Sequence, residues 1–164
     1  MKYLFLTRHA KSSWGNPGLA DIDRPLNERG KKAAPFMGKL IVDKGEKPEL
    51  LISSPAYRAL STAKAFGEVM GLVENDIIVN RAIYGAGAQQ LLELVQNQDD
   101  LHKSIMLFGH NPTFTSFVNL LTDSNLINVV TCGVVRIDFE YSSWTDIDFG
   151  SGRLVYYELS LIHI

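Results

Sequence analysis

Short apolar runs rich in β-forming residues alternate along this sequence with longer stretches of helical periodicity, and this alternation constrains the fold more than any other feature. It is typical of strand-helix-strand units, in which helices cover a mostly parallel sheet. Strands are predicted at residues 3–6, 50–52, 77–79, 105–108, 134–139 and 154–159. No helical pattern separates the last two, and residues 148–153 contain Gly-Ser-Gly, so we expect an antiparallel hairpin there.

Helical patterns fill most of the segments between these strands. The first predicted helix is capped by Asn27 and ends near Gly45, and Pro35 should kink it or mark a late start. The others cover residues 56–70, a stretch around 91–95, and a segment opened by Asn111-Pro112-Thr113. The apolar residues expected to face the core are Ala33, Phe36, Met37, Leu40, Ile41, Leu60, Ala63, Phe66, Met70, Leu91, Leu92, Leu94, Val95, Phe114, Phe117, Val118 and Leu121.

The composition fits one globular domain. The chain has 164 residues, near the ~150 of an average domain, and no repeat or linker, so we expect a single domain over residues 1–164. Its net charge of −2 argues against broad binding to nucleic acid or acidic lipid. No segment approaches the ~20 apolar residues that span a bilayer, and the first apolar run is too short for a signal peptide. The single cysteine, Cys132, excludes an internal disulfide and fits a reducing compartment, so we expect the chain to be cytoplasmic. We also expect a monomer without nucleic-acid or membrane partners.

Polar residues follow three of the predicted strands. In a parallel sheet, ligands bind at the edge formed by the carboxyl ends of the strands. Thr7-Arg8-His9 follows the first strand, Ser53-Ser54-Pro55 with Arg58 the second, and Gly109-His110-Asn111 the fourth. Arginine repels a metal cation but matches the oxygens of phosphate, and a helix that starts near Pro55 can add N–H donors. One histidine can then attack phosphorus while the other donates to a phosphoryl oxygen.

These motifs resemble those of the histidine phosphatase superfamily, and the order of five blocks is similar to that of the small SixA-type phosphohistidine phosphatases. The blocks are Thr7-Arg8-His9-Ala10, Arg24-Pro25-Leu26-Asn27-Glu28-Arg29-Gly30, Ser54-Pro55 with Arg58, Gly109-His110-Asn111-Pro112 and Thr131-Cys132-Gly133-Val134. The resemblance implies a three-layer α/β/α sandwich of the phosphoglycerate mutase-like type, with a mainly parallel sheet and an antiparallel strand. It also implies that His9 is the nucleophile, that Arg8, Arg58 and His110 bind the phosphoryl oxygens, and that Arg24 lines the pocket, without metal or cofactor.

The sequence departs from the family pattern at two places. Ala10 stands where the first block often has glycine, and no carboxylate occupies Asn111 or residues 83–86, where ester-cleaving branches place an acid. An imidazole leaving group has a pKa of ~6.5 and needs little help from an acid, whereas an alkoxide needs a proton. The expected substrate is therefore phosphohistidine on a protein, such as a histidine-phosphotransfer domain or a phosphocarrier. No irregular stretch is long enough for an inserted lid, so the pocket should be open to a protein. Lys11, Ser12, Ser13 and Trp14 can then contact that partner. The expected substrate-binding residues are Arg24, Asn111, Lys11 and Ser12.

Two alternatives stay open. The chain could hydrolyse small phosphate esters, with Asp21, Asp23 or Glu28 as the proton source, or it could be a non-catalytic module that binds phosphoproteins. Arg24 could also serve only as an ion-pair partner of Asp21 or Asp23.

The remaining candidate residues are expected to have no chemical role. His102 and His163 are expected at the surface, and Cys132, with Asp138 six residues on instead of arginine, is expected to be an inert, semi-buried residue. Gly85-Ala86-Gly87 lacks the third glycine of a dinucleotide fingerprint, and no P-loop motif occurs, so neither NAD nor ATP is indicated.

Overall fold

The computed structural model describes residues 1–73 and 76–159, and its centre is a sheet of six strands in the order β3-β2-β4-β1-β5-β6. The strands are β1 (Lys2–Arg8), β2 (Leu50–Ser53), β3 (Ile77–Val79), β4 (Ser104–Gly109), β5 (Val134–Phe139) and β6 (Arg153–Glu158). β1, β4, β2 and β3 pair in parallel, while β5 is antiparallel to both β1 and β6. The expected mainly parallel sheet with one antiparallel strand is confirmed.

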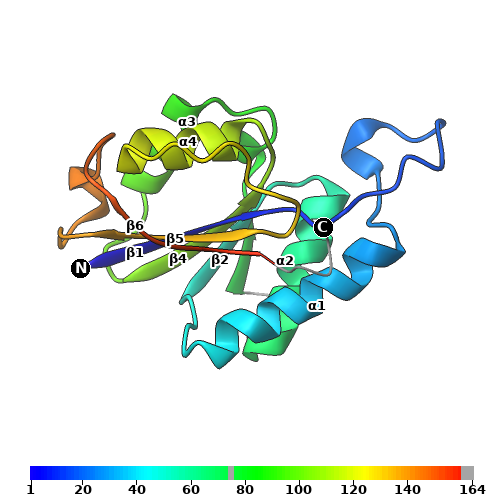
Figure 1. The fold of residues 1–164 in the computed structure, drawn as a ribbon, viewed down its shortest axis with the longest axis horizontal. Helices are drawn as coiled ribbons and strands as arrows, with labels where there is room; N and C mark the ends of the chain where they lie inside the picture. The colour runs from blue at the N-terminus through cyan, green and yellow to red at the C-terminus, as the bar shows by residue number, and fades with distance from the viewer. Residues whose placement is uncertain (74–75, 160–164) are drawn as a thin grey trace.

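Helices cover both faces of this sheet, so the chain forms three layers (Figure 1). α1 (Glu28–Asp43) and α2 (Tyr57–Met70) lie on one face, and α3 (Ala88–Gln96) and α4 (Thr113–Thr122) lie on the other. Each face of the sheet has its own apolar cluster, one with Phe66 and Phe108, the other with Phe114 and Phe117. None of the helices in the described part of the chain has the length and apolar content needed to cross a membrane.

Helix α1 begins where its cap was predicted. The N–H of Gly30 donates to Asn27 Oδ1 over 2.8 Å, and this bond satisfies one of the free donors of the first turn. The alternative late start at Pro35 is wrong, because Pro35 lies inside the helix. Its ring faces solvent, where water can bind the carbonyl that loses an N–H partner. Phe36 was expected in the core but is 47% exposed, because α1 buries a narrower stripe than the apolar spacing indicates.

The hairpin of β5 and β6 is confirmed, but its connection is longer and more ordered than the predicted turn. It contains a short 3-10 helix, η4 (Trp144–Asp146), whose Trp144 is fully buried. The backbone N–H of Trp144 donates to Asp100 Oδ1 over 2.8 Å, and its indole donates to the carbonyl of His102. These bonds fasten the connection to the segment before β4.

The carboxyl ends of β1, β4 and β2 meet at one edge of the sheet. Arg8 pairs with Gly109 across β1 and β4, and the N–H of His9 donates to the carbonyl of Gly109 over 3.0 Å. The N–H of Ser54, just after β2, donates to the carbonyl of Phe108 over 3.0 Å. A Cβ at Gly109 would lie 2.4 Å from Phe114 Cζ, so glycine lets α4 pack closely here. The predicted polar segments thus converge.

Candidate active site

A cavity of about 510 Å³ opens at this edge of the sheet. All eight residues predicted for catalysis or substrate binding line it, namely Arg8, His9, Lys11, Ser12, Arg24, Arg58, His110 and Asn111. Of the two further residues expected to contact the partner, Trp14 lines the cavity and Ser13 is not among the lining residues. The other lining residues are Asn27, Arg29 and Thr131, which had no predicted role. The cavity wall contains no Asp or Glu among the residues that the structure describes.

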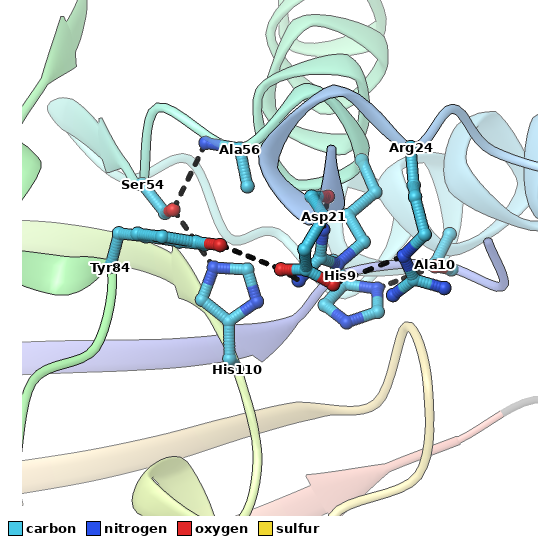
Figure 2. Close-up of polar contacts among 9 residues, drawn as sticks. His9, Ala10, Asp21, Arg24, Ser54, Ala56, Tyr84 and His110 are labelled. Atoms are coloured by element: carbon cyan, nitrogen blue, oxygen red, sulfur yellow. Dashed lines mark hydrogen bonds and ion pairs between the residues drawn. The ribbon is translucent and has the colours of Figure 1, made fainter. Parts of the chain in front are cut away.

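His9 is buried at the end of β1 and presents one defined nitrogen. Its Nδ1 lies 2.7 Å from the carbonyl of Ala10, which can only accept, so Nδ1 carries the proton and donates (Figure 2). Burial, reinforced by His110 and Arg58, lowers the pKa of His9 to about 3, although the bond to Ala10 opposes this. The imidazole is therefore neutral at physiological pH, and Nε2 carries a free lone pair.

The backbone beside His9 is fixed by α2 and by the loop before β5. The N–H of Ala10 donates to Thr62 Oγ1 over 3.0 Å, and that hydroxyl donates to the carbonyl of Arg58 over 2.7 Å. The N–H of Cys132 donates to the carbonyls of Arg8 and His9 over 2.9 and 3.1 Å. Thr62 is thus a support of the site that the sequence analysis did not select.

His110 follows β4 and is oriented by Ser54. Its Nε2 lies 2.8 Å from Ser54 Oγ, which also accepts from the N–H of Ala56 over 3.2 Å (Figure 2). Because Ser54 accepts from Ala56, its hydroxyl proton is available for Nε2, and we assign the imidazole proton to Nδ1. Burial and then Arg58 lower the pKa of His110 to about 4, so this ring is also neutral. The two imidazole centroids are 5.2 Å apart.

The start of α2 serves the site differently from the expectation. The N–H of Ala56 is bound by Ser54, while Pro55 and Tyr57 line a neighbouring groove. α2 contributes to the cavity through the side chain of Arg58.

Asp21 binds two of the arginines that line the cavity. Arg58 donates from Nη1 to the carbonyl of Asp21 over 2.7 Å and from Nη2 to its Oδ2 over 3.0 Å. Arg24 donates from Nε to Asp21 Oδ1 over 3.1 Å, so Arg24 both lines the cavity and forms the alternative ion pair (Figure 2). Arg8 is held separately, because its Nη1 donates to the carbonyl of Val129 over 3.0 Å.

Tyr84, which follows β3, also binds Asp21. Its hydroxyl donates to Asp21 Oδ2 over 2.7 Å, and its ring packs edge-on against His110. This hydrogen bond, then those of Arg58, lowers the pKa of Asp21 to about 2, so the carboxylate is ionised. Tyr84 follows β3 by only a few residues, but nothing in the sequence indicates a contact across 63 positions.

Most of the unpaired buried polar atoms belong to residues that line the cavity. Among the described residues, the buried side-chain nitrogens and oxygens without a hydrogen-bond partner are Thr7 Oγ1, Arg8 Nε, Arg24 Nη1, Arg58 Nε, His110 Nδ1 and Tyr156 OH. Four of these six belong to cavity residues, and all four are nitrogen donors once His110 carries its proton on Nδ1. Three of these residues are arginines, and their positive charge suits an anion with several oxygens.

Asn111 lines the cavity, but its amide is occupied with structural bonds. Nδ2 donates to Asn128 Oδ1 and to the carbonyl of Val129 over 2.7 and 2.8 Å, and Oδ1 accepts from Thr115. The side chain therefore fastens the loop before β5 to the start of α4. The expected substrate contact of Asn111 has no donor left to make it.

The other candidate residues are not among those that line the cavity. Asp23 lines the neighbouring groove, and Glu28 pairs with Lys31 over 3.3 Å. His102 lies partly exposed near Glu49, as expected of a surface residue. Cys132 is more deeply buried than predicted, at 1% exposure, and burial raises its thiol pKa to about 12.

The prediction for His163 falls outside the described residues. Within the described ranges, no three His, Cys, Asp or Glu side chains are grouped so that they could hold a metal ion.

Comparisons with known proteins identify relatives of this chain. Residues 4–81 match the family model of the histidine phosphatase superfamily, branch 1. An uncharacterized chloroplastic protein of Arabidopsis thaliana is 30% identical over 151 residues, which cover 87% of this chain and 69% of that protein.

Two solved structures illustrate the likeness of the fold. One, described as the "putative phosphohistidine phosphatase SixA" of Agrobacterium tumefaciens, is 28% identical, with a TM-score of 0.83 over 97% of this chain and 98% of that chain. The protein histidine phosphatase SixA in complex with tungstate gives a TM-score of 0.80 over 94% and 95% of the two chains, and at 17% identity this shows a shared fold.

Proposed function

The chain belongs to the histidine phosphatase superfamily and is a phosphatase, and we propose that it removes the phosphoryl group from phosphohistidine carried on a protein. The observation that carries the proposal is that Arg8, Arg24, Arg58 and His110 line one cavity with His9, whose Nε2 is free. A phosphoryl group brings three oxygens and negative charge to a cavity lined by three arginines.

In the first proposed step, His9 Nε2 attacks phosphorus. A bond forms between Nε2 and phosphorus while the bond between phosphorus and the substrate's imidazole breaks, and its electron pair returns to the substrate nitrogen. The substrate ring already carries a proton on its other nitrogen, so it leaves as neutral imidazole. Arg8, Arg58 and His110 stabilise the charge on the phosphoryl oxygens, so the protein contributes positioning and electrostatic stabilisation. The bond from His9 Nδ1 to Ala10 orients the ring and stabilises the positive charge that develops on it.

In the second step, water attacks phosphorus of phospho-His9 and displaces the imidazole of His9. The water oxygen becomes the fourth oxygen of inorganic phosphate, one proton passes to solvent or to the phosphate, and His9 Nε2 regains its lone pair. Both leaving groups are imidazoles, and neither needs the strong acid that an alkoxide needs.

The state of Asp21 supports a substrate with a phosphorus–nitrogen bond. Asp21 is the carboxylate attached to the cavity's arginines, and its pKa of about 2 leaves it without a proton at physiological pH. It therefore cannot protonate an alkoxide leaving group in this arrangement. The alternative of a small-ester phosphatase would require Asp21 to leave its partners and take up a proton first.

The test is a panel of phosphoryl donors with phosphate release as the readout. A phosphohistidine-bearing phosphotransfer domain, a phosphocarrier and phosphoramidate should be hydrolysed much faster than glycerol or sugar phosphates. His9→Ala should abolish turnover and acid-labile labelling by a radioactive donor, whereas His102→Ala, which removes a histidine outside the cavity, should keep both. Preference for the esters would overturn the substrate assignment, and full activity of His9→Ala would overturn the mechanism.

A further inference from the structure

We infer that Lys11, Trp14 and Arg29 form an outer rim of the cavity that binds a carboxylate-bearing surface of the protein substrate beside its phosphohistidine. The inference rests on the proposed function and specifies which protein surfaces the site accepts.

Charge is distributed unevenly between the inner cavity and this outer rim. The lining contains five permanent or near-permanent cations, whose side chains belong to Arg8, Lys11, Arg24, Arg29 and Arg58. The inner arginines have protein partners, namely Asp21 for Arg24 and Arg58 and the carbonyl of Val129 for Arg8.

The two outer cations, by contrast, are unpaired. Over residues 1–73 and 76–159, the side chains of Lys11 and Arg29 have neither an ion pair nor a hydrogen bond. The nearest acidic residue in sequence, Glu28, pairs with Lys31 instead.

The backbone holds the two outer cations next to each other. The carbonyl of Lys11 accepts from the N–H of Asn27 over 2.9 Å, and a Cβ at Gly30 would lie 2.1 Å from the same carbonyl oxygen. The backbone of Lys11 therefore contacts Asn27 and Gly30, which flank Arg29 in the sequence. The residues that carry these two like charges are thus neighbours in the structure, and both line the cavity of a chain whose net charge is −2.

Trp14 adds an apolar contact surface between this pair and the inner cavity. Its side chain lines the cavity although the residue is 77% exposed, and the guanidinium of Arg24 lies 3.4 Å from its ring centroid. Stacking on a buried arginine restricts the indole without covering it. An exposed, restrained aromatic ring beside cations is typical of a surface that contacts another protein.

The charges specify what this surface should contact. The phosphoryl group occupies the inner arginines and His110, which leaves Lys11 and Arg29 for a second anionic group of the same substrate. On a protein, that group is an Asp or Glu side chain near the phosphohistidine, and its apolar neighbours can contact Trp14. Attraction of this kind increases the rate of encounter and selects among partners more than it increases affinity.

The experiment uses two synthetic phosphohistidine peptides that differ only in flanking residues, glutamate in one and glutamine in the other. For the wild-type chain at low salt, kcat/KM should be higher for the glutamate peptide by about fivefold, the effect of one or two exposed ion pairs. The preference should disappear at high salt, because exposed charges are screened. In the double variant Lys11→Gln, Arg29→Gln the preference should be lost at any salt concentration. Lys32→Gln, which removes an exposed cation of α1 outside the cavity, should keep it.

Each outcome separates the inference from the function on which it rests. Equal rates for both peptides with the wild-type chain, or an unchanged preference in the double variant, would overturn the outer rim while leaving phosphohistidine hydrolysis in place. Hydrolysis of small esters but of neither peptide would overturn the proposed function, and the rim with it. A preference for small molecules with a second phosphate over the glutamate peptide would assign the two cations to a bis-anionic metabolite instead.

Discussion

At the scale of single residues, the two histidines differ because their neighbours bind different nitrogens. The carbonyl of Ala10 accepts a hydrogen bond from His9 Nδ1 and leaves Nε2 free, whereas Ser54 contacts His110 Nε2 and leaves the proton on Nδ1. In the proposed mechanism the first ring is the nucleophile and the second is a donor. The sequence motifs indicate both histidines, but the choice of nitrogen depends on contacts with Ser54 on another strand end, which no local pattern reveals.

Ser54→Ala should lower kcat by about tenfold, the effect of losing one orienting hydrogen bond, with a smaller change in KM. The reason is that His110 can then place its proton on either nitrogen. Steady-state kinetics with phosphoramidate measure the effect, and Ser54→Thr should restore most of the rate. The matched control is Ser53→Ala, because Ser53 Oγ donates to the carbonyl of Ser54 and does not contact His110. An equal loss in Ser53→Ala would show that Ser54 acts only through the local backbone.

Asp21→Asn separates an orienting carboxylate from a proton donor. Because Asp21 holds Arg58 and Arg24, we expect kcat/KM to fall about tenfold for phosphoramidate and for glycerol phosphate alike, as weakened charge-assisted bonds leave the arginines less ordered. The ratio of the two rates should therefore stay constant. A loss confined to the ester would identify Asp21 as its acid and favour the alternative function.

At the scale of elements, the strands were predictable because each is a short run rich in apolar, β-forming residues, and all six occur where the sequence places them, with small shifts at the ends. The errors arise where tertiary contacts decide. Phe36 has the spacing of a core residue, yet α1 turns it to solvent, and Asn111 follows His110 but its amide binds a loop. Tyr84 reaches Asp21 only because the strand order places β3 and the loop after β1 at the same edge.

The close approach of α1 to the loop after β1 depends on Gly30. Gly30→Ala would place a methyl group 2.1 Å from a backbone oxygen of Lys11, and neither side can give way without moving the loop that leads from His9. We expect a loss of about 1–3 kcal/mol in the free energy of unfolding, as for other overpacked sites. Lower kcat/KM should accompany it. Urea denaturation and kinetics measure the two effects, and Gly87→Ala, which meets only a side-chain oxygen at 3.5 Å, is the control that should change neither.

At the scale of the whole molecule, the three-layer fold buries two histidines that stay neutral. In the folded chain the pKa of His9 is lowered to about 3 and that of His110 to about 4, whereas an unfolded histidine has a pKa of ~6.5. Between these limits the unfolded chain binds more protons than the folded one, so stability is complete above pH ~6.5 and is lost as the pH falls. The site thus makes the fold sensitive to acid in a range where carboxylates contribute little.

This acid sensitivity is measurable as the slope of the free energy of unfolding against pH. From pH 6 to pH 4.5, each of the two histidines should reduce the free energy of unfolding by about 1.4 kcal/mol per pH unit, the value for one proton taken up on unfolding. Urea denaturation across this range should give a flatter dependence for the double variant His9→Gln, His110→Gln than for the wild-type chain. Asp21, with its pKa lowered to about 2, adds a loss of the same sign only near and below the carboxyl pKa of ~3.9, so it leaves this window largely unaffected. Parallel curves for the two proteins would mean that both cavity histidines are protonated in the folded chain over this pH range, which would contradict the lowered pKa values of His9 and His110.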